Sequence, residues 1–139
     1  MKKFLIVTAL IPVLIISLYF YKTHKQNLTN IHLDENYIEE ISIAKLPSPP
    51  KNKVLSEKKD IKKIVNFINS IKLTKKVDQP FKGWVYLIKI NGKNDFNISF
   101  LRDKININGT WYEIDSNIVN TLDDLYKELD YKEENFFNK

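Results

Sequence analysis

The sequence contains no cysteine, and only two of its 139 residues are histidines. The lack of cysteine excludes disulfide bonds, a thiol nucleophile and the cysteine-containing types of zinc site. Both histidines, His24 and His32, precede the part of the chain that we expect to fold, so a histidine base is not expected beside a nucleophile. We therefore expect no catalytic residue, no metal site and no cofactor.

Glycine and arginine are also scarce. The three glycines, at positions 83, 92 and 109, are too far apart to form a phosphate-binding loop. A single arginine, Arg102, and the absence of a recognised motif argue against nucleic-acid binding. Carboxylates occur as adjacent pairs, such as Asp123 with Asp124, and neighbours in a helix point in different directions. We expect a protein that is not an enzyme, with a carboxylate-dependent envelope hydrolase as the alternative.

One long apolar run stands at the N-terminus, from Phe4 to Tyr21, with lysines on both sides. As a helix, 18 residues span roughly 27 Å, close to the roughly 30 Å of a bilayer's hydrocarbon core. The run ends without the small residues that a signal peptidase requires, and no cysteine is present to carry a lipid. We predict an uncleaved membrane anchor over residues 1–25, with cleavage at an unrecognised site as the alternative.

The lysines before and after the apolar run barely discriminate the orientation by the positive-inside rule. The very short N-terminal flank favours a cytoplasmic N-terminus, and hence a single-pass protein of the cell membrane whose C-terminal domain is extracellular. We expect a stalk over residues 26–36, one domain over residues 37–130 and a charged tail over residues 131–139.

Hydrophobic periodicity predicts an α+β domain. Residues 38–46 alternate between apolar and polar, as in a half-buried strand that the following prolines end. Residues 57–72 carry an isoleucine-rich stripe at helical spacing, and residues 117–130 carry a leucine stripe of the same kind. Between these two predicted helices, apolar-alternating runs predict a four-stranded antiparallel meander.

Three short turn sequences set the register of this meander: Asn91-Gly92, Arg102-Asp103 and Asn108-Gly109. Asparagine followed by glycine is typical of two-residue hairpin turns. Two-residue turns predict these facing pairs: Leu87 with Phe96, Val85 with Ile98, Phe100 with Ile105, Ile98 with Ile107, and Ile105 with Tyr112. One apolar face then gathers Val85, Leu87, Phe96, Ile98, Phe100, Ile105, Ile107, Tyr112 and Ile114.

The opposite face of the predicted meander is mostly polar, with Asp95, Asn97, Ser99, Lys104, Asn106 and Glu113. The same register places Trp84, Tyr86, Ile88, Ile90, Leu101 and Trp111 there as well. This stripe is either covered by the C-terminal helix or by the stalk and first strand, or exposed as a binding patch. Trp84, Tyr86 and Trp111 are therefore candidate binding residues.

Residues 45–76 contain ten lysines and only two acidic residues. In the predicted helix, Lys58, Lys59, Lys62 and Lys63 fall largely on the side away from the apolar stripe. They form either an ordinary solvated helix face or a surface attracted to lipid headgroups or to an anionic polymer of the cell envelope.

Three segments carry a resemblance: "ISIAKLPSPPKNKVLSEKKDIKKIVNFINSIK", "GWVYLIKING" and "ININGTWYEID". Over roughly Ile38 to Leu129, the chain resembles a domain-of-unknown-function family of small exported proteins from low-GC Gram-positive bacteria. The resemblance implies a location at the outer side of the membrane and brings no catalytic residues. Many relatives are lipoproteins, and the missing cysteine departs from that pattern. Together these features predict a membrane-tethered module that binds an envelope polymer, lipid headgroups or a protein partner.

Overall fold

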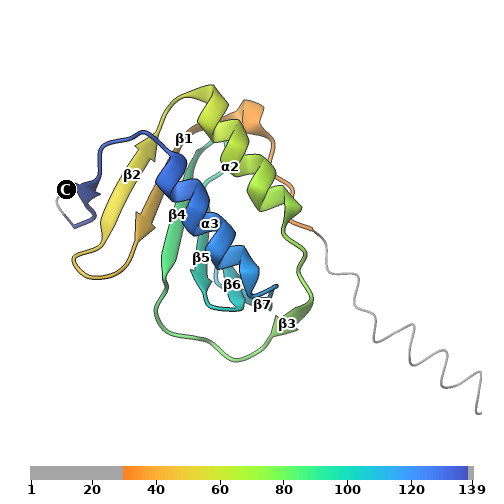
Figure 1. Cartoon of the computed structure of the whole chain (residues 1–139). Helices are drawn as coiled ribbons and strands as arrows, with labels where there is room; N and C mark the ends of the chain where they lie inside the picture. The colour runs from red at the N-terminus through yellow and green to blue at the C-terminus, as the bar shows by residue number, and fades with distance from the viewer. Residues whose placement is uncertain (1–29, 138–139) are drawn as a thin grey trace, which may run out of the picture.

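The computed structural model describes residues 30–137, which form an eight-stranded antiparallel sheet with two helices (Figure 1). The predicted α+β class is therefore confirmed. The predicted anchor at residues 4–21 lies outside the described residues. Within residues 30–137, neither helix has the length and apolar character needed to pass through a bilayer.

A short 3-10 helix, two α-helices and eight strands make up the domain. In chain order they are η1 (Glu35–Tyr37), β1 (Ile38–Lys45), β2 (Lys51–Leu55), α2 (Lys58–Ser70), β3 (Lys75–Val77), β4 (Tyr86–Gly92), β5 (Phe96–Leu101), β6 (Lys104–Ile107), β7 (Thr110–Glu113), α3 (Asn117–Glu128) and β8 (Glu134–Asn135). Across the sheet the strand order is β3-β7-β6-β5-β4-β1-β2-β8. The predicted first strand, meander and two helices are present, and strands β2, β3 and β8 are additional.

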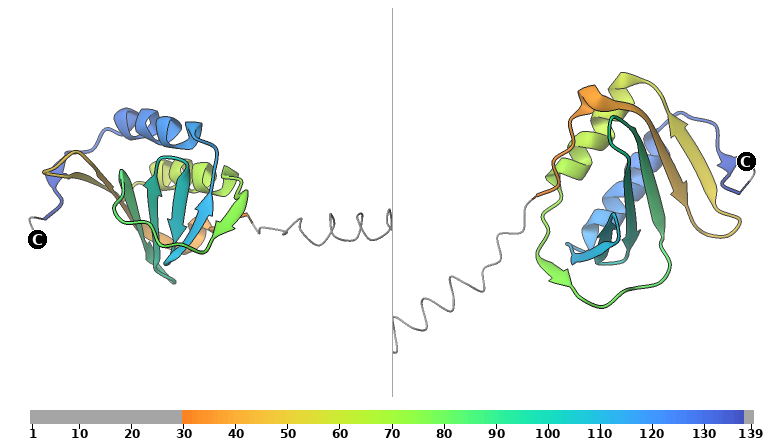
Figure 2. Two further views of the ribbon diagram at one scale, coloured as in Figure 1. Left: turned by 90° about the horizontal axis from the view of Figure 1, so that it is seen from below. Right: turned by 180° about the vertical axis from the view of Figure 1, so that it is seen from behind.

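Both helices lie on the same face of the sheet, which leaves the other face without a helix (Figure 2). The predicted stripe of α2 is buried against the sheet, with Ile61, Ile64 and Ile68 fully covered. From α3, Leu122 and Tyr126 are buried. The hydrophobic core is the layer between these helices and the sheet, because the apolar side of an amphipathic helix packs where it loses water.

Two of the three predicted turns are confirmed. Asn108 and Gly109 have positive φ angles of 48° and 93°, as a two-residue hairpin turn of this type requires. The predicted facing pairs between β5 and β6 and between β6 and β7 are also confirmed, including Phe100 with Ile105.

The predicted register between β4 and β5 is wrong. Ile88 pairs with Ile98 and Ile90 pairs with Phe96, which shifts β4 by three residues and reverses its two faces. The last pair between the two strands is Ile90 with Phe96, so residues 91–95 separate the paired residues instead of only Asn91 and Gly92. The shift turns Tyr86, Ile88 and Ile90 toward the helices, where each is at most 1% exposed.

Gly92 explains why this turn is not a two-residue hairpin. Strand β4 continues to Gly92, where the chain passes closely over η1. A Cβ atom added there would lie 2.0 Å from the Tyr37 carbonyl oxygen. The same oxygen accepts a hydrogen bond of 3.0 Å from the Lys93 N–H. The glycine therefore permits a close approach between two backbone segments. This is a different use of glycine from the tight hairpin turn that was predicted here.

Packing of the domain begins before the expected boundary at residue 37. Ile31 and Leu33, in the segment expected to be a stalk, are 7% and 6% exposed and join the core. The Asn69 side chain in α2 accepts a hydrogen bond from the Leu33 N–H and donates one to the Leu33 carbonyl, both of 2.8 Å. These two hydrogen bonds attach the segment to the last turn of α2.

At the other end of the chain, part of the expected charged tail forms β8. Asn135 and Glu134 pair with Lys51 and Asn52 of β2. The Phe136 N–H donates to the Pro50 carbonyl oxygen over 2.9 Å. The C-terminal residues therefore close the edge of β2.

Lys53 of β2 joins the sheet to the end of α3. Its Nζ donates to the carbonyl oxygens of Tyr126 and Leu129, at 3.0 and 2.6 Å, and lies 4.7 Å from the centre of the Tyr126 ring. Carbonyls in the last turn of a helix lack partners within the helix, and a cation there also suits the helix dipole. Lys53 is only 7% exposed, so it is a buried helix cap rather than a solvated lysine.

Candidate functional site

The face of the sheet turned away from the helices is the main candidate surface, and we call it the open face. Its residues alternate with core residues such as Ile98 and Ile105. One row of paired residues crosses all eight strands on this face: Val77, Trp111, Asn106, Ser99, Leu87, Ala44, Asn52 and Glu134. The polar side predicted for the meander is therefore confirmed for Asn97, Ser99, Lys104, Asn106 and Glu113.

Aromatic side chains gather at one end of the open face. The rings of Trp84 and Phe136 meet edge-on with centroids 5.8 Å apart, and Phe136 meets Phe137 in the same way at 5.2 Å. The Lys89 ammonium lies 5.3 Å from the centre of the Phe136 ring. Phe137 is 73% exposed, so this cluster presents aromatic surface to solvent.

A hollow of about 300 Å³ lies beside this cluster, and we call it the Phe136 hollow. Strands β1, β2 and β4 and the C-terminal segment contribute its lining: Glu40, Ser42, Asn52, Val54, Lys89, Asn91, Phe136 and Phe137. The lining combines two amides, a hydroxyl, one negative and one positive charge, and two phenyl rings. Such a mixture of apolar walls and a few polar groups is typical of ligand sites.

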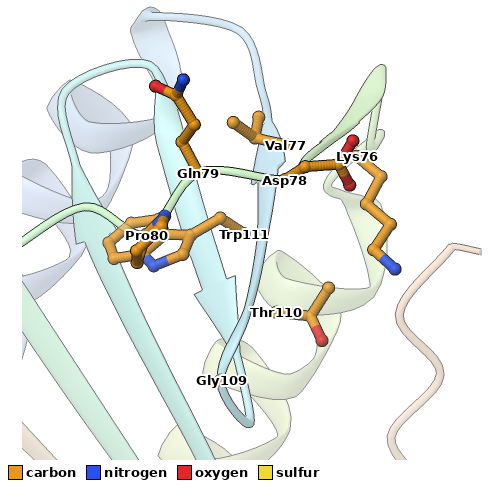
Figure 3. Close-up of a pocket in the computed structure, with 8 residues that line it drawn as sticks. All are labelled: Lys76, Val77, Asp78, Gln79, Pro80, Gly109, Thr110 and Trp111. Atoms are coloured by element: carbon orange, nitrogen blue, oxygen red, sulfur yellow. The ribbon is translucent and has the colours of Figure 1, made fainter.

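A second hollow, of about 240 Å³, lies toward the β3 edge of the sheet. Figure 3 shows Lys76 at one end of this hollow and the Trp111 ring toward the other, with the 78–80 loop between β3 and β4 running past both. Phe81 meets the Trp111 ring edge-on at 5.5 Å, and the Lys104 ammonium lies 5.9 Å from the Phe81 ring centre. Aromatic groups therefore flank the polar middle of the open face on both sides.

The three predicted aromatic binding residues occupy different environments. Trp84 is half-buried in the cluster at one end of the open face. Trp111 lies at the other end and is only 8% exposed. Tyr86 lies on the helix side of the sheet and is 1% exposed, so it is not available to a ligand at the open face. The covered alternative is confirmed for Tyr86, which packs edge-on against Tyr126 of α3.

Tyr86 instead belongs to an ionic cluster beneath α3. Its hydroxyl and the Lys45 ammonium both donate to one oxygen of Asp123, and Lys127 contacts the other oxygen at 2.7 Å. The hydrogen bonds from Lys127, Lys45 and Tyr86, in that order, hold the pKa of Asp123 well below its usual range. Burial, and then the hydrogen bond to Asp123, raises the pKa of Tyr86 well above its usual range.

The hydroxyl of Tyr126 is buried beside this cluster without a hydrogen-bond partner among the described residues. Its burial, and secondarily the nearby Glu133 carboxylate, raises the pKa of Tyr126 above its usual range. Both tyrosines therefore stay protonated at neutral pH. The cluster fastens α3 to the strands through fixed contacts, and its carboxylate is already used by three donors.

Three of the four predicted binding lysines have partners within the domain. Lys58 donates to the Ile38 carbonyl at 3.0 Å, Lys62 contacts Glu35 at 2.9 Å, and Lys63 contacts Glu128. For Lys59 the described residues provide no ion-pair partner. The two ion pairs, of Lys62 and Lys63, are exposed and each contributes little stability, but they reduce the local positive potential of α2.

Two further hollows lie elsewhere on the described residues. One, of about 220 Å³, is lined by residues that include His32, Asp34 and Tyr37; the other, of about 360 Å³, includes Asp115 and Asn117. Each of the four hollows has a single carboxylate in its lining. Among residues 30–137, no three His, Cys, Asp or Glu side chains are grouped as a metal site would require.

Sequence reasoning missed most of the residues that line the Phe136 hollow. Phe136 and Phe137 stand in a segment read as a charged tail, although two adjacent phenylalanines there were a usable signal of packing. Ser42 and Asn52 come together because β1 pairs with β2, a strand hidden among lysines and prolines. The prediction that Trp84 is a binding residue did not depend on the pairing of β1 with β2.

No protein-family model, curated protein or solved structure matches this chain, so its resemblance to the exported family stays a prediction.

Proposed function

We propose that the protein is a membrane-anchored binding module at the outer side of the cell membrane, whose open face contacts a component of the cell envelope. The location rests on the apolar run at residues 4–21, which is long enough to span a bilayer. The observation that supports binding is the open face itself, a sheet surface that no helix covers, with aromatic groups at both ends. Exposed aromatic clusters on small domains commonly mark interaction sites.

The same geometry gives less support to a carboxylate-dependent hydrolase. Hydrolysis by paired carboxylates needs two of them on either side of one substrate bond. The four hollows have one carboxylate each, and Asp123 is held by Lys45, Lys127 and Tyr86. The open face instead offers hydrogen-bonding groups and rings, which are the means of recognition rather than of bond cleavage.

Site-specific photo-crosslinking in intact cells tests this proposal. A photo-reactive side chain replaces Asn97, which is exposed on the open face, in the full-length chain. A matched variant carries the same group at Asn66, which is exposed on α2. We expect a discrete cross-linked envelope product from position 97 and none from position 66. Equal labelling at both positions, or none at either, would contradict a binding role for the open face.

A further inference from the structure

We propose that the Phe136 hollow binds a segment of an uncharged saccharide chain. The inference rests on the proposed function, because it names the class of ligand that the open face would contact. It uses four observations on the described residues: the volume of the hollow, its charge balance, its free hydrogen-bonding capacity and its aromatic walls.

The charge balance of the hollow favours an uncharged ligand. Its lining contains one carboxylate, Glu40, and one ammonium group, Lys89. The Asn91 side chain donates to Glu40 at 3.2 Å, and Lys89 lies over the Phe136 ring. An anionic polymer would meet no excess of positive charge here, unlike the phosphate sites of proteins, which gather cations. A neutral ligand would leave both charges balanced.

The polar floor of the hollow has unused hydrogen-bonding capacity. The Asn52 side-chain oxygen accepts a hydrogen bond of 2.7 Å from the Ser42 hydroxyl. Within the described part of the chain, the Asn52 amide nitrogen has no acceptor, although the residue is only 7% exposed. An amide has two N–H donors and a hydroxyl keeps acceptor lone pairs. A ligand with many hydroxyl groups can satisfy both, because each hydroxyl donates and accepts.

The aromatic walls suit the C–H surface of a sugar ring. The C–H bonds on one side of a pyranose carry a small positive charge, and the face of an aromatic ring is negative. Phe136 and Phe137 stand edge-on to one another, and Phe137 is largely exposed. A volume of about 300 Å³ is at the small end of ligand sites, so the hollow accommodates a short part of a chain rather than a large compact molecule.

A peptide is less well suited to this place. Extended peptides commonly bind by adding a strand to a free sheet edge. Next to the hollow, the edge of β2 is already paired with β8 through Lys51 and Asn52. Beyond that pairing the sheet ends at β8, whose two residues offer only a short edge for an added strand. Side-chain groups therefore supply most of the contacts available to a ligand in the hollow.

The test measures binding of defined probes to the full-length chain in phosphatidylcholine nanodiscs, by calorimetry and tryptophan fluorescence. The probes are the uncharged chitohexaose and cellohexaose, the anionic hexagalacturonate and a capped, uncharged hexapeptide. Nanodiscs avoid detergents that carry a sugar headgroup. We expect at least one uncharged oligosaccharide to bind. Binding of only the anionic probe, of only the peptide, or of none of the four overturns the proposal.

Substitutions in the hollow test whether the ligand binds there. We expect Phe137→Ala to weaken oligosaccharide binding about fivefold to tenfold, because it removes an exposed ring from the wall. Asn91→Ala is a second variant, for an exposed polar group of the lining. Phe81→Ala, at the far end of the open face, and Tyr37→Ala, outside it, are the matched controls and should bind as the unmodified chain does.

Unchanged affinity in both Phe137→Ala and Asn91→Ala would show that the sugar binds elsewhere and would overturn the assignment. Circular dichroism establishes that each variant is folded. The outcome for the proposed function is separate: cross-linking at Asn97 without any saccharide binding would leave the binding module in place and reject only its ligand class.

Discussion

At the scale of single residues, Asp123 shows how one side chain can be fully used by the fold. Its two oxygens accept from Lys45, Tyr86 and Lys127, which belong to β1, β4 and α3. In the sequence it stands beside Asp124 as one of an adjacent pair, and nothing in the local spacing shows which strand residues lie beneath α3. The structure separates the two carboxylates, because Asp124 is 74% exposed and its ion pair within residues 30–137 is with Lys127, at 3.6 Å.

We expect Asp123→Asn to lower the free energy of unfolding at pH 7 by about 1–3 kcal/mol, since hydrogen bonds to a charged group are lost. The folded state lowers the pKa of Asp123. Its contribution is therefore fully present above the unfolded-state pKa of about 3.9 and is lost as the pH falls toward the folded-state value. Urea unfolding of the full chain at pH 7, 4 and 3 measures this.

The difference in the free energy of unfolding between the unmodified chain and Asp123→Asn should thus become smaller as the pH falls. Asp124→Asn is the matched control and should change stability by less than about 0.5 kcal/mol. A difference that stays constant from pH 7 to pH 3 would be incompatible with the ionic role given to Asp123.

At the scale of elements, helices and strands with regular apolar spacing were predictable from sequence, and pairing between distant segments was not. The stripe of α2 and the Asn108-Gly109 turn follow from local chemistry. Strands β3 and β8 have three and two residues, too few to produce a periodic pattern. The register of β4 failed because its Asn-Gly pair resembles a tight turn, whereas Gly92 is placed by contact with η1.

This explanation predicts the effect of Gly92→Ala. The new methyl group would meet the Tyr37 carbonyl and force β4 away from η1. We expect a loss of about 1–3 kcal/mol in the free energy of unfolding, as for other overpacked sites. Thermal and urea unfolding measure it. Asn94→Ala, an exposed change in the same turn, is the control and should lie within about 0.5 kcal/mol of the unmodified chain. Equal stability of the two variants would refute the close-approach role of Gly92.

The candidate site was predictable only in part, because it too depends on pairing between distant segments of the chain. Trp84 and the polar meander residues were found because they share a short stretch of chain. Phe136 reaches the open face from the C-terminal segment, and Asn52 reaches it from β2. A hollow assembled from β1, β2, β4 and the chain end depends on long-range pairing, which a single sequence does not encode in any local pattern.

At the scale of the whole molecule, the distribution of charge changes the expected partner. The ten lysines of residues 45–76 suggested an anionic surface as ligand. In the structure, Lys53 caps α3, Lys45 joins the Asp123 cluster, and Lys62 and Lys63 contact carboxylates. Three of the ten lysines therefore face carboxylates within the domain, and a fourth is buried as a helix cap. This leaves the open face, where charges of both signs occur together with aromatic groups, as the more distinctive surface.

The proposed location makes a prediction about the whole chain. Protease added to intact cells should remove the domain, because residues after the anchor are expected to lie outside the membrane. The loop at residues 78–83, exposed throughout, is the expected first site of cleavage. Immunoblotting of the full-length chain in intact and in lysed cells measures this. Digestion only after lysis would place the domain in the cytoplasm.

The contact between Leu33 and Asn69 also bears on how tension along the chain would enter the domain. The Leu33 N–H and carbonyl are both held by one amide side chain of α2, and Ile31 is already buried two residues earlier. Tension applied through the chain before residue 30 would therefore act first on this buried segment, held to α2 by Asn69, and only then on β1.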